Sequence, residues 1–196
     1  MIADHLKSAT AQQKWLITHI ASDPVRMQIL RQVRALNAPD CWVAAGFVRS
    51  LVWDRLHQRS CSPLPDDIDV IWYDPEQTDA RTDQSLQASL SAMDNEVKWS
   101  VKNQARMHAR NGDAPYMSAT DAMVYWPETA TAVAVRLSAQ DEIEIAAPFG
   151  LADLFALVVR PSPRFQQDKH AIFLGRIDSK QWKSKWPGLT FPTDGR

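Results

Sequence analysis

The chain has 196 residues, of which 45% are apolar and 23% are charged, a composition typical of a globular protein with one hydrophobic core. Lys and Arg total 22 against 23 Asp and Glu, and the formal net charge of -1 excludes non-specific nucleic-acid binding through a polybasic surface. No apolar run approaches the roughly 20 residues that span a bilayer, and the N-terminal stretch lacks the apolar centre of a signal peptide. We therefore expect a cytoplasmic protein that does not cross a membrane.

Two helices are predicted within residues 1–38. Apolar side chains recur at spacings of three and four residues over His5–Ser22, and they do so again over Val25–Leu36. Pro24 stands at the first position of the second segment, where a helix tolerates proline because that N–H has no intrahelical partner. These helices precede the predicted sheet.

A sheet-bearing core is predicted from 41 to 147. The apolar run at 41–45 predicts a strand, Gly46 a tight turn, and the apolar spacing over Val48–Leu56 a helix. After a loop that contains two prolines, alternating and β-branched residues predict a second strand that begins at about Asp67. This core is completed by a helix that ends near Met93, by strands at 97–102, 129–137 and 143–146, and by helices that start at Asn103 and Ser118.

Helices are expected again from 150 to 190, at Leu151–Val159, at Pro163–Ile177 and around Trp182. No internal repeat, low-complexity tract or linker divides the sequence, so we predict a single domain over residues 1–196. The mixture of strands and helices indicates an α+β fold, in which a mixed β-sheet has flanking helices and helical N- and C-terminal segments.

Two carboxylates open the second predicted strand. Asp67 and Asp69 flank Ile68, and side chains two residues apart on a strand leave from the same face. Two carboxylates held side by side repel each other, and Mg²⁺ or Mn²⁺ relieves that repulsion while keeping coordination positions for phosphate oxygens. The alternative is that Asp66, Asp67 and Asp69 are ordinary turn and strand-edge residues.

The strand, turn and helix just upstream predict an anion site. A glycine at position 46 lets the backbone approach a ligand closely, and a helix N-terminus stabilises anions through its unpaired N–H groups. Arg49 lies in the first turn of this helix and can add a bidentate phosphate contact. A surface ion pair of Arg49 with Asp54 or another nearby acid is the alternative.

A cluster of polar side chains follows the strand at 97–102. Asn103 suits a helix cap, Gln104 and His108 share a helix face at four-residue spacing, and Lys102 with Arg106 suits phosphate or an acidic acceptor. Each residue also has a structural alternative as a cap, a buried hydrogen-bond partner or a surface ion pair. The density of polar groups after an apolar strand favours a pocket wall.

The order of strand, glycine turn, helix and strand with Asp-hydrophobic-Asp resembles the nucleotidyltransferase superfamily related to DNA polymerase β. Five segments narrow the resemblance to one bacterial family of nucleotidyltransferase-like proteins, namely AGFVRSLVWD, DDIDVIWYD, WSVKNQARMH, WPETATAVAVRL and APFGLADLF. The resemblance extends from about Cys41 to Trp186, and its most specific element is Val101–His108. It implies a Mg²⁺-dependent protein that binds an NTP, with ATP favoured, and transfers NMP, with AMP favoured, to an unidentified hydroxyl acceptor. The alternative is a catalytically inactive nucleotide-sensing or protein-interaction module on the same fold.

The resemblance also implies roles for single residues. Asp67 and Asp69 match the two metal-binding carboxylates of the superfamily. Gly46, Phe47 and Arg49 match its phosphate-binding turn, although a small residue usually stands where this chain has Phe47.

The superfamily's third carboxylate, which lies on a neighbouring strand and serves as base and metal ligand, has three candidate positions here. Glu96 precedes the strand of Ser100 by an even spacing, and we favour it as the catalytic base; a solvated Glu at the strand end is the alternative. Glu144 stands between two isoleucines in a later strand. If Ser100 itself occupies the equivalent position, the base is missing.

Overall fold

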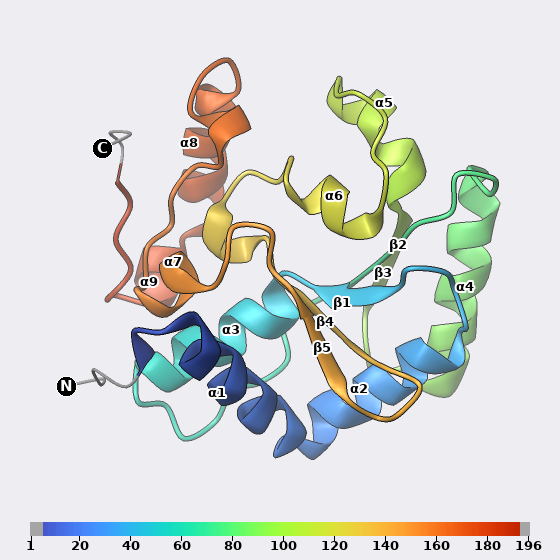
Figure 1. Cartoon of the computed structure of the whole chain (residues 1–196), viewed down its shortest axis with the longest axis horizontal. Helices are drawn as coiled ribbons and strands as arrows, with labels where there is room; N and C mark the ends of the chain where they lie inside the picture. Colours follow the sequence, from blue (N-terminus) through green and yellow to red (C-terminus); the bar gives the residue numbers. More distant parts are fainter. Residues whose placement is uncertain (1–5, 193–196) are drawn as a thin grey trace.

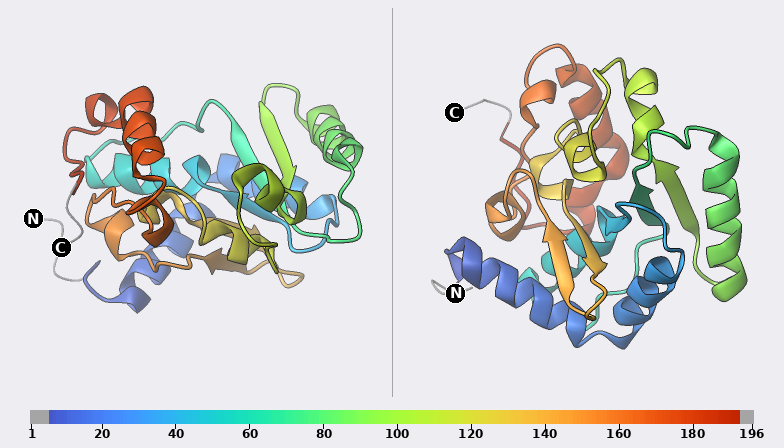
Figure 2. Two further views of the ribbon diagram at one scale, coloured as in Figure 1. Left: turned by 90° about the horizontal axis from the view of Figure 1, so that it is seen from above. Right: turned by 45° about the vertical axis from the view of Figure 1, so that its right-hand side comes forward.

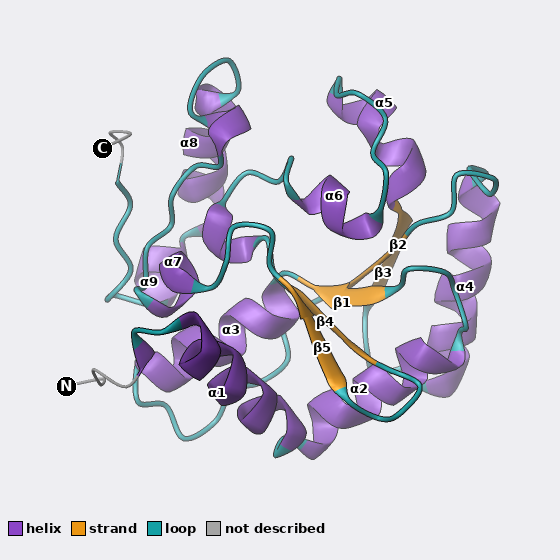
Figure 3. Cartoon of the chain, viewed as in Figure 1, coloured by secondary structure: helices purple, strands orange, loops and turns teal. Residues whose placement is uncertain are grey.

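The computed structural model describes residues 6–192, in which a five-stranded sheet carries helices on both faces (Figures 1 and 3). The strand order is β3-β2-β1-β4-β5; β2 and β3 run parallel, and the other neighbouring strands run antiparallel. The predicted α+β fold with a mixed sheet is therefore confirmed. The strands are β1 (Trp42–Ala44), β2 (Ile68–Trp72), β3 (Trp99–Asn103), β4 (Ala134–Leu137) and β5 (Ile143–Ala146).

The helices begin where the sequence supplies caps. Ser8 accepts a hydrogen bond from the Ala11 N–H at the start of α1, and Asp23 caps α2 in the same way ahead of Pro24. Among the described residues, no helix is long and apolar enough to cross a membrane. The helices are α1 (Ala9–Ala21), α2 (Pro24–Ala35), α3 (Gly46–Leu56), α4 (Ala80–Met93), α5 (Met107–Asn111), α6 (Ala119–Met123), α7 (Ala152–Phe155), α8 (His170–Lys180) and α9 (Trp182–Lys185), with 3-10 turns η2 (Gln104–Arg106), η3 (Thr129–Thr131) and η4 (Pro163–Phe165).

The two faces of the sheet differ in what covers them. Val43, Val70 and Val101 point into the larger core, which they share with apolar side chains of α1 to α4. Ala44 and Ile71 point to the opposite face, where they pack with residues of α6. Because side chains alternate along a strand, Asp69 lies on this second face with Ile71. In Figure 1, α5, α6 and α8 lie above the strands, and the right-hand view of Figure 2 shows them on the same side of the strands.

Four predicted elements differ from the structure. The helix predicted over Leu151–Val159 covers only Ala152–Phe155, which is α7. Residues 129–131 form the 3-10 turn η3 instead of the start of a strand, because the Thr129 N–H bonds to the Arg160 carbonyl and not to a neighbouring strand. The helix predicted over Pro163–Ile177 is interrupted after η4 and resumes at His170. Asn103 ends β3 and caps η2, so the helical segment begins one residue later than predicted. His5, the predicted start of the first helix, lies outside the described residues.

Candidate functional site

Asp69 and Ser100 form the centre of the candidate site. They are register partners on the parallel strands β2 and β3, which places their side chains next to each other on one face of the sheet. Burial and the nearby Asp67 carboxylate raise the pKa of Asp69, while Ser100 and Arg49 act in the opposite direction. Asp67 is exposed and stands two residues earlier, just before β2. The structure thus brings the two predicted carboxylates within electrostatic reach of each other.

A cavity of about 310 Å³ opens beside Asp69, between the sheet, α5 and α8. Such a volume is at the small end of the range for ligand pockets, roughly 300–1,000 Å³. Its apolar lining comes from Ile71, Met107 and Trp126. Its polar lining includes Asp69, Ser100, Lys102, Gln104 and Arg176.

The turn before α3 differs from the predicted glycine turn. Ala45, not Gly46, has the positive φ, with φ 50° and ψ -111°. Gly46 lies in a crowded position instead, since a Cβ there would be 3.2 Å from the Pro65 Cβ and 3.3 Å from an Nη of Arg49. No side chain caps the N-terminus of α3, so its first N–H groups remain available to an anion.

Arg49 folds back over the start of its own helix. Its guanidinium stacks on two indoles, at 5.3 Å from the ring centre of Trp53 and 4.8 Å from that of Trp182. Its Nε is buried and has no hydrogen-bond partner among the described residues. Burial lowers the pKa of Arg49 to about 10, with Glu128 acting in the opposite direction, so the side chain is a cation at neutral pH.

The alternative partner considered for Arg49 is engaged elsewhere. Asp54 pairs with Arg59 at 2.7 Å and accepts hydrogen bonds from Ser62 and from the Trp186 indole. The alternative Arg49–Asp54 ion pair is therefore absent, and the charge of Arg49 interacts instead with Glu128, Asp69 and Asp67.

The remaining predicted nucleotide ligands divide into two groups. Lys102 and Gln104 line the cavity, and the Gln104 amide also bonds to the Lys102 carbonyl. Phe47 is fully buried in the larger core, which leaves only its backbone to face a ligand.

Asn103, Arg106 and His108 make structural contacts. The Asn103 side chain bonds to the carbonyls of Asp74 and Gln77 and accepts from two backbone N–H groups. Arg106 pairs with the buried Asp83, and His108 bonds through Nδ1 to the Ala105 carbonyl. For these three residues, the cap, ion pair and hydrogen bond weighed as alternatives are present in the structure.

The structure places the three candidates for the third carboxylate position very differently. Ser100 is beside Asp69, whereas Glu96 is exposed in a bend three residues before β3. Glu144 lies on β5 and pairs with Arg136 at 2.6 Å. Three strand steps separate β5 from β2, about 14 Å at the usual strand spacing. Within residues 6–192, no three His, Cys, Asp or Glu side chains gather as a metal cluster.

Sequence reasoning missed two charged residues of the site. Arg176 of α8 lines the cavity, and Glu128, which is fully buried, pairs with it at 2.6 Å. Their separation of 48 residues gives no local spacing signal. The only available indication is Glu128 within the segment WPETATAVAVRL, whose resemblance assigns it no role.

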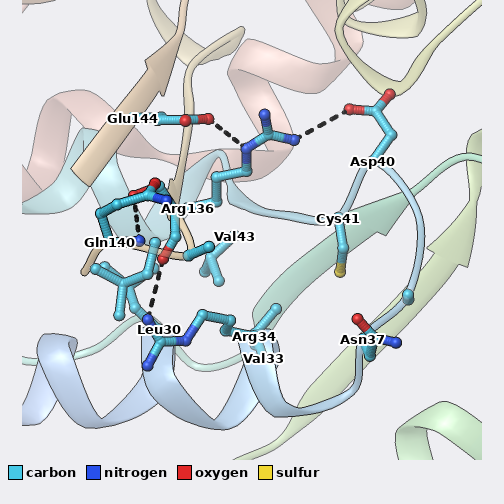
Figure 4. Close-up of a pocket in the computed structure, with 14 residues that line it drawn as sticks. Leu30, Val33, Arg34, Asn37, Asp40, Cys41, Val43, Arg136, Gln140 and Glu144 are labelled. Carbon is cyan, nitrogen blue, oxygen red and sulfur yellow. Dashed lines mark hydrogen bonds and ion pairs between the residues drawn. The ribbon is translucent and has the colours of Figure 1, made fainter. Parts of the chain in front are cut away.

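A second cavity, also of about 310 Å³, lies between α2 and the β4–β5 hairpin (Figure 4). Val43 contributes to its lining from the face of the sheet opposite to Asp69. Its charged groups pair with one another or with nearby residues: Arg136 with Asp40 and Glu144, and Arg34 with Asp141. We therefore place the candidate site at Asp69.

Comparison with known proteins identifies the family of the chain. Residues 31–191 match a protein family described as nucleotidyltransferase. An NMR structure described as a CCA-adding enzyme head domain is 33% identical, with a TM-score of 0.81 over 92% of this chain and 96% of that one. No curated protein matches the chain in sequence.

Larger enzymes share the fold at lower identity. A CCA-adding enzyme in complex with CTP and the Thermotoga maritima CCA-adding enzyme in complex with tRNA are each 16% identical, with TM-scores of 0.57 and 0.55. Each alignment covers 92% of this chain but only 43% and 42% of those enzymes, so the chain spans less than half of their length. The family match over most of the sequence and the similarity to the head domain together show that the chain belongs to this nucleotidyltransferase family.

Proposed function

We propose that the protein binds a nucleoside triphosphate with Mg²⁺ in the cavity beside Asp69 and transfers its NMP, with AMP favoured, to a hydroxyl acceptor. The observation that carries the proposal is the position of Asp69. Its carboxylate is partly buried, interacts with Asp67, and opens onto a cavity whose walls include Lys102 and Arg176. Carboxylates and cations around one cavity suit a metal-bound polyphosphate.

The donor set fits a magnesium ion. Asp67 and Asp69 offer hard oxygen ligands, and Mg²⁺ commonly takes one or two carboxylates together with substrate phosphates. Burial and the neighbouring Asp67 raise the pKa of Asp69, so a cation beside it would favour its ionised form. With Asp67 and Asp69 as ligands, a bound ion would neutralise charge on the transferring group and on the pyrophosphate.

The chain's own residues would bind and orient the nucleotide. Arg49 and the uncapped N-terminus of α3 would hold phosphate oxygens, because both present N–H donors and positive charge. Ile71, Met107 and Trp126 would provide an apolar surface for the base, with Gln104 as a nearby hydrogen-bonding group.

In the transfer step, the acceptor oxygen attacks the α-phosphorus, and the bond to the bridging oxygen of pyrophosphate breaks. The acceptor proton passes to a base, which we predict to be Glu96, or to solvent. Ser100 is the register partner of Asp69 and lacks the charge and basicity of a carboxylate.

One observation favours a second candidate function, a catalytically inactive nucleotide-sensing or protein-interaction module. Ser100 occupies the position on the neighbouring strand directly beside Asp69, where a third carboxylate would complete the metal site. In that case nucleotide binding would persist while transfer would be slow or absent.

A transfer assay with NTPs labelled at the α-phosphate separates the two functions. CTP, ATP and tRNA are tested first, because structurally similar enzymes form complexes with them. CTP and ATP serve as nucleotides and tRNA as an acceptor. Other RNA, small alcohols and cell extract are the further acceptors to test. General-base catalysis contributes roughly 100- to 10,000-fold, so losing it is readily measured. If the protein is an active nucleotidyltransferase, the wild type should transfer NMP. Glu96→Gln should then lower the rate of transfer much more than it lowers the affinity for Mg-NTP.

If the protein is a catalytically inactive module, the binding and transfer results should differ from these. Wild type would bind Mg-NTP and transfer little, and Ser100→Asp or Ser100→Glu would create or increase transfer by restoring a ligand. If wild type, Glu96→Gln and Ser100→Glu all bind Mg-NTP equally and transfer nothing to any acceptor, the proposed transfer activity is wrong.

A further inference from the structure

Two guanidinium groups from distant segments converge on one indole beside the cavity. Arg49 of α3 lies 4.8 Å from the ring centre of Trp182, and Arg176 of α8 lies 5.8 Å from the same ring. Trp182 is buried, so it fixes both side chains without neutralising either.

A buried carboxylate holds Arg176 in place. The Arg176 Nε donates to Oε1 of Glu128 at 2.6 Å, and Oε2 of Glu128 accepts from the Thr131 hydroxyl at 2.7 Å. Glu128 is fully buried, so this anchor is rigid compared with a surface ion pair. Only Nε of the Arg176 guanidinium forms this bond. The two terminal amino groups have no hydrogen-bond partner among the described residues.

The positive charge of the two arginines is only partly neutralised by nearby carboxylates. Glu128 bonds to Arg176, but within the described part of the chain no carboxylate forms an ion pair with Arg49. The two arginines also disfavour each other's charge. Paired guanidinium groups with free N–H donors are the usual ligands for phosphate oxygens, which they bind in bidentate fashion.

We propose that Arg49 and Arg176, fixed around Trp182 and anchored by Glu128, form a subsite for the phosphates beyond the α-phosphate of the nucleotide. This inference rests on the proposed function and adds α8 to the nucleotide site. It assigns the polyphosphate tail to the space between the start of α3 and α8, on the side of the cavity where Asp69 lies.

Calorimetric titration of the full chain with Mg²⁺ and ATP, AMP or tripolyphosphate tests the subsite. Arg176→Gln alone would leave Glu128 buried and unpaired, so the informative variant is the double substitution Arg176→Gln with Glu128→Gln, which removes both charges. Glu128→Gln alone keeps the guanidinium and an acceptor oxygen for it. Arg34→Gln is the matched control, because Arg34 is also 36% exposed and ion-paired but borders the other cavity.

We expect the double variant to bind ATP and tripolyphosphate about 10- to 100-fold more weakly than wild type, the range for a lost charge-assisted contact. AMP affinity should change less than threefold, the double variant should also bind ATP more weakly than Glu128→Gln does, and Arg34→Gln should bind ATP as wild type does, within about threefold. Circular dichroism confirms that each variant is folded.

Three results would overturn the subsite. Wild-type affinity of the double variant for ATP would leave the proposed nucleotide site intact but remove Arg176 from it. Equal weakening for AMP and ATP would place Arg176 at the nucleoside or α-phosphate instead. Wild type that binds neither ATP nor tripolyphosphate would contradict the subsite and the proposed function together, whereas binding of tripolyphosphate alone would retain the subsite and reject the nucleotide.

Discussion

Ala45 holds a backbone conformation that L-residues rarely adopt, at the point where β1 turns into α3. A non-glycine residue at φ 50° and ψ -111° costs on the order of 1–3 kcal/mol. Neighbouring hydrogen bonds hold it there: its N–H bonds to the Val133 carbonyl at 2.8 Å, and its carbonyl accepts from the Arg49 N–H at 2.9 Å. The strain therefore lies at the cavity wall, to which Ala45 contributes.

Ala45→Gly should stabilise the protein. The strain that the substitution removes exceeds the roughly 0.5–1 kcal/mol of extra chain entropy that glycine brings to the unfolded state, so we expect a gain of about 1 kcal/mol in the free energy of unfolding. Urea denaturation measures it. Gly46→Ala is the neighbouring comparison and should give no gain, because its Cβ meets Pro65 and Arg49. A loss of stability in Ala45→Gly would contradict the strain argument.

Asp69 makes stability depend on pH in a defined direction. Its pKa in the folded protein is raised above the ordinary 3.8, chiefly by burial and by Asp67. Below pH 3.8 the carboxyl is protonated in both states; as pH rises through the folded pKa, the folded state must ionise a buried group, so stability falls. Asp69→Asn cannot ionise, and it should melt at a higher temperature than wild type at pH 7 without metal.

The advantage of Asp69→Asn should shrink as the pH is lowered towards 3, which thermal melts at a series of pH values will show. Asp66→Asn controls for the loss of one negative charge in the same loop, because Asp66 is exposed. A variant less stable than wild type at pH 7, with a deficit that grows with pH, would be inconsistent with the raised pKa.

At the level of elements, the sequence predicted those whose pattern is local. Residues 143–146 form β5 as predicted, and Pro24 marks the start of α2. The segment at 129–131 has β-forming composition, but tertiary bonds determine its conformation: Thr129 bonds to Arg160 and Asp153, and the buried Glu128 bonds to Thr131. The β-forming propensity of a segment carries no information about such distant hydrogen-bond partners.

The corner between α4 and η2 should depend on Asp83. This buried carboxylate accepts from the Trp72 indole and the Asn103 N–H, both at 2.8 Å, and pairs with Arg106. Asp83→Ala leaves all three donors unmatched, and breaking a buried ion pair typically costs about 3–5 kcal/mol. Urea denaturation should show a loss of that order.

Arg81→Ala is the control on the same helix. Arg81 pairs with Asp79, but both side chains are largely exposed, so the substitution should change the free energy of unfolding far less than Asp83→Ala does. Similar effects of Asp83→Ala and Arg81→Ala would show that the buried cluster does not support this corner.

At the level of the whole molecule, the candidate site joins segments that the sequence keeps far apart. The spacing of Asp67 and Asp69 and the strand, turn and helix around Gly46 are local patterns, and they indicated this part of the site. Arg176 reaches the same cavity only because α8 folds back towards the sheet, and Glu128 meets it across 48 residues of sequence. Neither the segment around Glu128 nor the one around Arg176 has a periodicity or motif that predicts this contact. It is therefore visible only in the folded chain.

Calorimetric titration of wild type and Asp69→Asn with ATP, each with and without Mg²⁺, tests most directly whether this cavity is a metal-nucleotide site. We predict that wild type binds ATP and that the affinity depends on Mg²⁺, since Asp67 and Asp69 supply the ion's protein ligands. We also predict that Asp69→Asn folds but loses the Mg²⁺-dependent part of the affinity. Equal affinity in both proteins, unchanged by Mg²⁺, would contradict the assignment of Asp69 to a metal-nucleotide site.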